Sequence, residues 1–354
     1  MNTEALKVNL LKYLQERMIT EYPDPIIEEF GVMSMNVGME ATLYLFTLKC
    51  SNSEIKSADL ILKLYNGIIS TVLFDPKLSA KYEYLISRHI SRLGIAVSMV
   101  IAYELDDNGF FDYAFTIMEK LYGEPLQLYL HRLDNKGEHE AIWDKLAEIM
   151  VKLHSFEYTA FIRYFEELRY IDQPERYLEH DLELWLEIVK PFSVYEIFIP
   201  FIGWLSEMSS QIPLQQLSII HRDFSLGNFF REHDGRIVLI DWGISYLTDF
   251  RLALGYTLIS LRESNYQKIT RDKFLALYEE KSGMKVENIE FFEILALLKG
   301  IMISTILANF NSSFSSLGEA REFIKDEPDF KELKEISSKA YPSLYSILKQ
   351  DYLS

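Results

Sequence analysis

The sequence predicts an α+β protein with two lobes, a smaller β-rich lobe at residues 1–118 and a larger helical lobe at residues 119–354. The first observation behind this prediction is length, because 354 residues exceed what one hydrophobic core usually supports. The second is a change of pattern near residue 119, where short β-prone segments give way to helical periodicity. We expect a cleft between the two lobes.

The composition is that of a folded soluble protein, with 49% hydrophobic and 25% charged residues. A net charge of -17 argues against nucleic acid as a partner and favours a cationic or neutral substrate over an anionic one. Solubility is the favoured explanation of the acidity. Cys50 is the only cysteine, so we expect no disulfide framework and a reducing cytoplasm. Glu293 and Lys299 interrupt the apolar segment 291–310, which favours a buried core helix over a membrane span. No membrane partner is therefore expected.

The smaller lobe is expected to begin with a helix and to continue as an antiparallel sheet. Apolar residues spaced four apart predict an amphipathic helix at residues 4–20, ended by Pro23. A sheet of about five strands is expected to start near residue 26, and branched and aromatic residues place its other strands at 41–48, 59–65, 95–103 and 110–118. A turn with Gly38 could bring backbone N–H groups close to an anion.

Lys63 lies inside an otherwise apolar strand, and a lysine is rarely buried without a partner. It is either a lysine on an edge strand that faces water or one half of an internal ion pair. The next helical pattern, at residues 77–92, contains a single carboxylate, Glu83, which favours the ion pair. A strand lysine held by a helix glutamate can present its ammonium to nucleotide phosphates.

In the larger lobe, apolar residues at helical spacing predict a core helix at residues 138–155, which His154 ends as a packing or capping residue. Residues 158–204 are dense in aromatic and acidic side chains, and a solvated helix face is the favoured explanation of their charges. The segment 249–354 predicts several amphipathic helices and carries no clear motif.

Two short loops gather the polar residues that indicate chemistry. The first has the order H-x-D-x-x-x-x-N and supplies Asp223 and Asn228. The second follows an apolar strand and supplies Asp241, and the turn Asp234-Gly235 predicts a β-hairpin between the two loops. Carboxylate and amide oxygens together with phosphate oxygens are the ligands that Mg²⁺ prefers. Alone, this pattern is a weak signal, so its weight depends on the rest of the chain.

The elements and their order resemble the aminoglycoside phosphotransferase and choline kinase family, small-molecule kinases of the protein-kinase-like fold. The order is a glycine turn, a strand lysine, a helix glutamate, a hinge at residues 117–126, the loop at 221–228 and an aspartate after a strand. The resemblance covers about residues 26–255. It implies a two-lobed α+β kinase fold, with ATP as phosphate donor, GTP not excluded, and Mg²⁺.

The resemblance also implies roles for the polar residues of the loops and of the β-rich lobe. Asp223 would orient the acceptor hydroxyl and take its proton, while Asn228 and Asp241 would hold magnesium. Lys63, kept in place by Glu83, would contact the α- and β-phosphates. Phosphoryl transfer depends mainly on positioning and on neutralising developing negative charge, and these side chains supply both.

For the nucleotide base, the resemblance implies that the hinge backbone near Met118, Glu119 and Leu121 binds adenine. The turn with Gly38 would cover the phosphates, although relatives usually have more glycines there. Trp242 takes the place of the phenylalanine that follows the metal aspartate in protein kinases, and this change is common in the small-molecule branch.

The acceptor is expected to be a small molecule with a hydroxyl group. An acidic cleft that includes Asp181 and Glu183 would suit a cationic acceptor, and Trp185 would offer it a cation-π face. Two alternatives stay open at this point. The first is a kinase of protein substrates, which Arg222 favours, although the lack of an A-P-E segment after Asp241 counts against it. The second is a non-catalytic nucleotide-binding protein. The sequence leaves the oligomeric state open.

Overall fold

The structure is a computed structural model that describes residues 2–33, 41–50, 57–67, 74–105, 109–165, 173, 176–261, 269–312 and 314–352. These residues form two compact units, which are described separately. The first consists of Met1–Tyr129 and Leu226–Ser245, and the second of Leu130–Ser225 and Tyr246–Ser354. The predicted hairpin with the turn Asp234-Gly235 therefore belongs, by its contacts, to the first unit, together with the N-terminal part of the chain. The turn with Gly38 lies outside the described residues, and its role stays a prediction.

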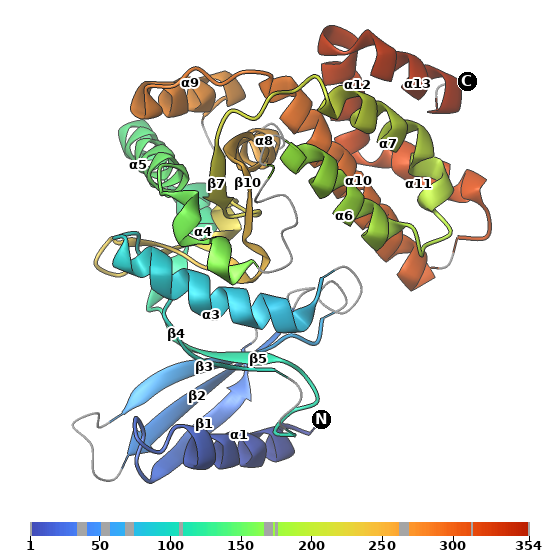
Figure 1. Ribbon diagram of the computed structural model, residues 1–354. Coiled ribbons are helices and arrows are strands. Elements are labelled where there is room, and N and C mark those ends of the chain that lie inside the picture. Colours follow the sequence, from blue (N-terminus) through green and yellow to red (C-terminus); the bar gives the residue numbers. More distant parts are fainter. Residues whose placement is uncertain are drawn as a thin grey trace. The chain divides into compact units, whose positions relative to one another are not determined.

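The first unit contains the five-stranded antiparallel sheet that the sequence predicts (Figure 1). Its strands are β1 (Pro25–Val32), β2 (Thr42–Cys50), β3 (Ala58–Leu64), β4 (Val100–Glu104) and β5 (Phe115–Glu119). They lie in the order β1-β2-β3-β5-β4, so β3 is the central strand and has neighbours on both sides. In the registers of β3, Lys63 pairs with Leu43 of β2 and with Thr116 of β5.

Strands β4 and β5 are shorter than predicted, because the apolar residues ahead of them serve other contacts. Val97 bridges to Leu239, and the carbonyl of Ala96 accepts a hydrogen bond of 3.0 Å from the Leu239 N–H. Phe110 packs edge-on against Tyr13 of the N-terminal helix, with 5.2 Å between ring centroids. The apolar residues ahead of β4 and β5 are therefore buried in other contacts and do not pair within the sheet.

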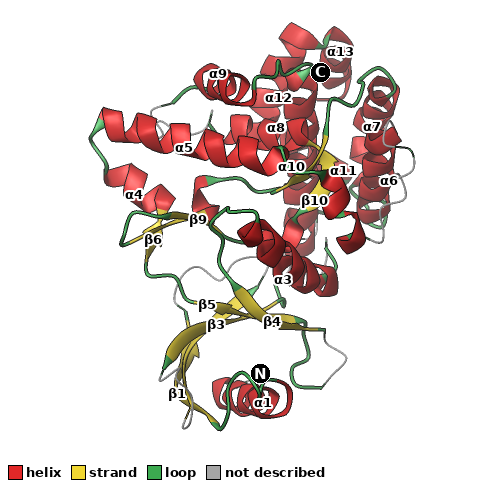
Figure 2. Cartoon of the chain, turned by 60° about the vertical axis from the view of Figure 1, so that its left-hand side comes forward, coloured by secondary structure: helices red, strands yellow, loops and turns green. Residues whose placement is uncertain are grey.

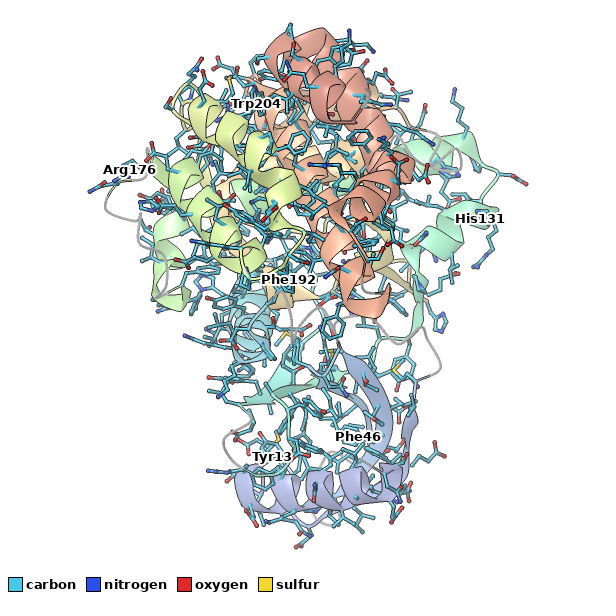
Figure 3. The ribbon with its side chains drawn as sticks, turned by 90° about the vertical axis from the view of Figure 1, so that its right-hand side faces the viewer. Tyr13, Phe46, His131, Arg176, Phe192 and Trp204 are labelled. Atoms are coloured by element: carbon cyan, nitrogen blue, oxygen red, sulfur yellow. The ribbon has the colours of Figure 1, made fainter. Side chains whose placement is uncertain are left out.

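Two helices pack against opposite faces of this sheet (Figures 1 and 2). They are α1 (Thr3–Arg17) and α3 (Pro76–Arg92), close to the predicted ranges. Helix α1 begins where the Asn2 side chain caps the Glu4 N–H, and α3 begins where Asp75 caps the Lys77 N–H, with Pro76 in its first turn. Figure 3 shows Tyr13 between α1 and the sheet, on the side where Phe46 contributes to the same buried cluster.

A small three-stranded sheet completes the first unit. Its strands are β6 (Gly123–Pro125), β8 (Phe229–Glu232) and β9 (Ile237–Leu239). The predicted hairpin between β8 and β9 is confirmed, and Gly235 in its turn has a φ of +89°, a conformation that favours glycine. Short 3-10 helices flank the hairpin at Leu226–Asn228 (η5) and Trp242–Ile244 (η6). The hairpin thus carries both expected metal ligands at its open end.

The second unit is mainly helical, as predicted. Its elements are α5 (Lys136–His154), η2 (Tyr158–Ala160), η3 (Ile162–Tyr164), α6 (Tyr177–Val189), α7 (Tyr195–Ser209), α8 (Phe250–Ser260), α9 (Arg271–Ser282), α10 (Ile289–Ser312), α11 (Leu317–Asp326), α12 (Pro328–Ala340) and α13 (Pro342–Tyr352). Helix α4 (Leu126–Arg132) contains the boundary between the units. Helices α6 and α7 lie side by side in Figures 1 and 2.

Two short strands of the second unit were not predicted. They are β7 (Leu217–Ile220) and β10 (Tyr246–Asp249), which form an antiparallel pair. At the end of this strand pair where Asp249 lies opposite Leu217, the Asp249 side chain caps α8. Asp249 also accepts two hydrogen bonds, of 2.9 and 2.7 Å, from the fully buried guanidinium of Arg251. Arg251 also donates to the carbonyls of Pro213 and Glu287. This bonding fixes one end of the strand pair whose other end carries Arg222 and Asp223.

Helix α10 is long and apolar enough to cross a membrane by length and composition. In an apolar stretch of 18 residues within Ile289–Phe310, 78% of the stretch is buried inside the protein. Glu293 is fully buried and paired with Arg271 on α9, with 2.8 Å between its Oε2 and the arginine Nη2. These contacts agree with the prediction of a buried core helix.

His154, the last residue of α5, is buried and has a structural role, as the sequence suggested. Its Nδ1 lies 3.0 Å from the Tyr278 hydroxyl, and its ring lies 5.7 Å from that of Phe250. Burial lowers the pKa of His154 to about 3. The imidazole is therefore neutral in the folded protein at every pH at which the protein would be used.

This buried histidine predicts a sensitivity to acid. Between pH 6.5 and 3 the unfolded chain binds a proton at His154 that the folded protein does not, so stability falls as the pH falls through this window. Across this window, proton binding to His154 in the unfolded chain lowers the free energy of unfolding by about 5 kcal/mol at most. Urea unfolding of wild type and of His154→Gln should show a difference in unfolding free energy that is constant above pH 7 and shrinks towards pH 3. Parallel pH profiles of the two proteins would contradict this, and His131→Gln, exposed on α4, is the matched control.

Candidate active site

Lys63 is the centre of the polar cluster in the first unit. It is 5% exposed on the central strand β3, so the alternative of an edge-strand lysine is wrong. Its Nζ lies 3.0 Å from Oε2 of Glu83 on α3 and 2.7 Å from Oδ1 of Asp241. The ion pair that the sequence suggested is therefore present, and it includes the aspartate of the second loop.

Glu83 is the buried partner of this lysine, with 3% of its surface exposed. Burial raises the pKa of Glu83, and the Asp241 carboxylate acts in the same direction, whereas Lys63 lowers it. A carboxylate in this position is costly unless it is paired and hydrogen-bonded. The Lys63 ammonium and one further donor meet that need.

The further donor is Tyr65, a residue that sequence reasoning missed. Its hydroxyl donates a hydrogen bond to Oε2 of Glu83, and its ring lies 4.8 Å below the Lys63 Nζ. The side chain is fully buried. The signal was present in the sequence, because residues i and i+2 of an extended segment point to the same side, which places an aromatic ring beside Lys63.

Asp241 has a left-handed backbone conformation, with φ 68° and ψ 61°. Few residues other than glycine adopt this region, and aspartate and asparagine tolerate it best. The side chain is one-third exposed, while the next residue, Trp242, is 1% exposed and donates its indole N–H to the Leu239 carbonyl. Trp242 anchors the short helix η6, which packs against α3. The buried tryptophan thus fixes the chain where Asp241 turns toward Lys63.

Asn228 and Asp241 flank the β8–β9 hairpin at its open end. Phe229 pairs with Leu239, and the Ile240 N–H donates to the Asn228 carbonyl at 2.9 Å. The register therefore brings an amide and a carboxylate oxygen, both partly exposed, to one end of the hairpin. Among the described residues, no group of three or more histidine, cysteine, aspartate or glutamate side chains could hold a metal ion. These two oxygen ligands suit Mg²⁺ that shares the phosphate oxygens of a nucleotide.

The hinge follows directly from β5. Met118 is buried, and the backbone N–H of Glu119 donates to the Met99 carbonyl at 3.0 Å. Asp59 of β3 holds the next residues, accepting bonds of 3.3 Å from Lys120 Nζ and 3.0 Å from the Tyr122 hydroxyl. The Thr47 hydroxyl bond to Asp59 is the main cause that lowers the pKa of this carboxyl. The predicted contacts of Met118, Glu119 and Leu121 with a base remain a prediction.

Gly123 lies within the predicted hinge, at a point where the neighbouring strand leaves no room for a side chain. A Cβ atom at this position would lie 2.0 Å from the backbone oxygen of Arg231 in β8. The register pairs Gly123 with Glu232. A close backbone approach of this kind requires glycine, which gives a physical reason for the glycine within the predicted hinge.

In the second unit, β7 leads into the loop with the H-x-D pattern. His221 is buried, Arg222 is partly exposed and Asp223 is exposed. The strand pair β7–β10, held at its other end by Asp249, thus places the expected base on the surface of its unit. An exposed carboxylate next to a buried, fixed strand end has the access that a proton acceptor needs.

The three residues of α6 expected to contact the acceptor differ in what they expose. Asp181 is 2% exposed and forms an ion pair with Lys299 of α10, and Trp185 is 5% exposed. Only Glu183 of these three exposes its carboxylate, at 62%, where it lies 3.2 Å from Nδ1 of His180. The negative charge of Asp181 is therefore already neutralised within the protein, which does not support its assignment to a cationic acceptor.

Known structures share this fold. A Ralstonia eutropha JMP134 protein assigned to the aminoglycoside phosphotransferases is 15% identical, with a TM-score of 0.60 over 96% of this chain and 97% of that one. The GDP and kanamycin complex of APH(2")-IIIa is 14% identical, with a TM-score of 0.59 over 91% and 99%. Choline kinase LicA from Streptococcus pneumoniae is 16% identical, with a TM-score of 0.53 over 93% and 99%. The predicted protein-kinase-like α+β fold is confirmed.

A comparison with curated protein sequences found no match. The model of one protein family, described as the phosphotransferase enzyme family, matches residues 52–287. This range contains Lys63, Glu83, Asp223, Asn228 and Asp241, and it is about two-thirds of the chain. The prediction of a phosphotransferase of the aminoglycoside phosphotransferase type is confirmed, and the chain belongs to the phosphotransferase enzyme family.

Proposed function

We propose that this protein transfers the γ-phosphate of a nucleoside triphosphate, with ATP as the expected donor, to a hydroxyl group of a small molecule in the cytoplasm. The observation that carries this proposal is the position of Lys63, whose Nζ is held at 3.0 Å from Glu83 and 2.7 Å from Asp241. An ammonium fixed between a buried carboxylate and a metal-binding carboxylate suits a phosphate-bearing ligand. The structure with GDP and a complex of LicA with AMP show that similar proteins bind nucleotides.

The roles proposed for the residues follow from their positions. Lys63 binds the α- and β-phosphates, and Glu83 with Tyr65 fixes its direction. Asn228 and Asp241 would hold Mg²⁺, which would supply positive charge to neutralise the phosphates. Each of these side chains comes from the first unit, where the sheet, α3 and the β8–β9 hairpin set their geometry.

Asp223 accepts the proton of the acceptor hydroxyl as its oxygen attacks the γ-phosphorus. The new phosphorus–oxygen bond forms in line with the bond to the leaving nucleoside diphosphate, which breaks. The hydroxyl proton passes to the Asp223 carboxylate, whose exposure in its unit gives it access to a hydroxyl group. Of the three α6 residues expected to contact the acceptor, Glu183 is the one with an accessible carboxylate for a cationic group.

The experiment that tests this function is an acceptor screen. Similar proteins are complexed with kanamycin or gentamicin, or are choline kinases, so these aminoglycosides and choline lead the panel, with ethanolamine and hexoses beside them. With MgATP or MgGTP, we expect acceptor-dependent release of nucleoside diphosphate. Magnesium-dependent nucleotide binding without consumption against the whole panel would instead support the non-catalytic alternative.

A further inference from the structure

Arg222, the residue directly before Asp223, contacts side chains from three different elements of the second unit. Its guanidinium carbon lies 5.7 Å from the ring centroid of Trp185 on α6 and 5.4 Å from that of Tyr246 on β10. It also donates a hydrogen bond to the hydroxyl of Tyr256 on α8. We call Trp185, Tyr246 and Tyr256 the arginine clamp. Guanidinium planes stack well on aromatic faces, so the clamp restricts both the position and the orientation of Arg222.

A buried ion pair supports the clamp from within the helical core. Lys299 of α10 has its Nζ 5.0 Å from the Trp185 ring and forms an ion pair with Asp181, and the two side chains are 1% and 3% exposed. The pKa of Lys299 is lowered to about 8, mainly by burial; Asp181 raises this pKa, and Arg222 lowers it. The two cations are therefore close enough to affect each other, and they share Trp185 as a neighbour.

This arrangement explains Asp181 and Trp185 better than contact with an acceptor does. Lys299 and Arg222 already lie over the Trp185 ring, so its cation-π capacity is used inside the protein. Burial raises the pKa of Tyr256 to about 12, so its hydroxyl stays neutral beside Arg222. The electrostatic neighbours of Tyr256 include Asp181 and Asp223 as well as Arg222. The clamp thus connects the buried pair in the core with the loop that carries the expected base.

We propose that Arg222 is a positioning residue, and that the clamp of Trp185, Tyr246 and Tyr256 holds it so that the Asp223 carboxylate keeps a fixed direction. This proposal rests on the proposed function, in which Asp223 takes the acceptor proton. Arg222 precedes Asp223 by one peptide bond, so fixing its side chain limits the backbone rotations that move the carboxylate. A misplacement of about 1 Å at a reacting group lowers the rate by about 100-fold.

The test compares Arg222→Met, which removes the cation, with Arg222→Lys, which keeps the charge and loses the planar group, and Tyr256→Phe, which removes one hydroxyl. Kanamycin and choline serve as acceptors. If the protein phosphorylates neither of them, the rate of MgATP hydrolysis by water is measured instead. We expect Arg222→Met to lower kcat by about 100-fold and to leave the KM for MgATP unchanged, because the phosphate-binding residues belong to the other unit. Arg222→Lys should recover only part of the loss, and Tyr256→Phe should be milder.

Arg163 is the matched control, since its guanidinium carbon lies 4.9 Å from the Tyr164 ring in the same unit, away from the loop in sequence. Arg163→Met should keep full turnover. Amide hydrogen exchange needs no acceptor, and in Arg222→Met the peptide 217–226 should exchange faster while the peptide 229–239 keeps its rate. Unchanged exchange and unchanged kcat in Arg222→Met would overturn the proposal.

A second mutation separates the clamp from the proposed function. In an Asp223→Asn background, Arg222→Met should cause less than about a twofold further loss, because two residues that act as a unit are not additive. A further loss of the full size would overturn the positioning role, since Arg222 would then act independently of Asp223. Full turnover in Asp223→Asn alone would overturn Asp223 as the base, and the exchange of peptide 217–226 would still decide whether the clamp orders the loop.

Discussion

Asp223→Asn is expected to lower turnover by about 100- to 10,000-fold while magnesium-dependent nucleotide binding stays intact, the range that general base catalysis usually contributes. Asparagine has nearly the same shape as aspartate and cannot take a proton from the acceptor hydroxyl. The residues proposed to contact the nucleotide lie in the first unit, so the KM for MgATP should change little. The measurement is nucleoside diphosphate release with the acceptor that the screen identifies, together with calorimetric titration of MgATP.

The control for this variant is Asp134→Asn, an exposed carboxylate in the same unit that should keep wild-type turnover. Thermal unfolding of both variants checks that neither has lost its fold. If Asp223→Asn turned over at the wild-type rate, another group would have to accept the proton, and the proposed mechanism would be wrong at its central step.

Asp241→Ala should have the second large effect, the loss of magnesium-dependent nucleotide binding. Removal of the carboxylate takes away one of the two expected metal ligands, and a metal ion contributes several kcal/mol of charge stabilisation, so we expect affinity for MgATP to fall by about 100-fold or more. Binding of MgATP and of ATP with a chelator, measured by calorimetry, gives the magnesium-dependent part directly.

Backbone strain must be separated from loss of the ligand in this variant. Asp241 has a φ of 68°, and alanine pays about 1–2 kcal/mol in this conformation, whereas asparagine tolerates it. Asp241→Asn therefore keeps the backbone and removes only the charge, and it should lose most of the binding without the loss of stability. Asp234→Asn in the exposed turn of the same hairpin is the control. Unchanged magnesium-dependent binding in Asp241→Ala would remove Asp241 from the metal site.

The central pair of the first unit could be predicted because its signal is chemical as well as periodic. A lysine in an apolar strand needs a partner, and the next helix offered a single carboxylate. The structure confirms the Lys63–Glu83 pair at 3.0 Å. The hairpin was also predictable, since Asp234-Gly235 is a strong turn signal between two β-prone segments.

Other features depend on contacts that local sequence does not encode. The four-residue strands β7 and β10 are too short to show periodicity and form only because they pair with each other. Asp181 and Lys299 are 118 positions apart, so nothing in the sequence pattern linked them. The charges of α6 were expected on a solvated face, and for Asp181 that expectation was wrong because α10 supplies its partner.

The left-handed conformation of Asp241 was also beyond sequence reasoning. It depends on Trp242 being buried against α3, and a tryptophan after an aspartate does not indicate that packing. Strained backbone of this kind persists only where the surroundings determine it, which is common at functional sites. The sequence therefore predicted the hairpin that carries Asn228 and Asp241, while the geometry of Asp241 came from tertiary packing.

Phosphorus NMR of a complete reaction tests the central claim most directly. The wild-type protein is incubated with MgATP and the acceptor that gives the fastest nucleoside diphosphate release in the screen. The account predicts a new phosphomonoester resonance equal in amount to the ADP formed, which at equal incubation time is at least about 100-fold weaker with Asp223→Asn than with wild type. Inorganic phosphate as the sole product in the presence of the whole acceptor panel, or ADP formed equally by both proteins, would contradict it.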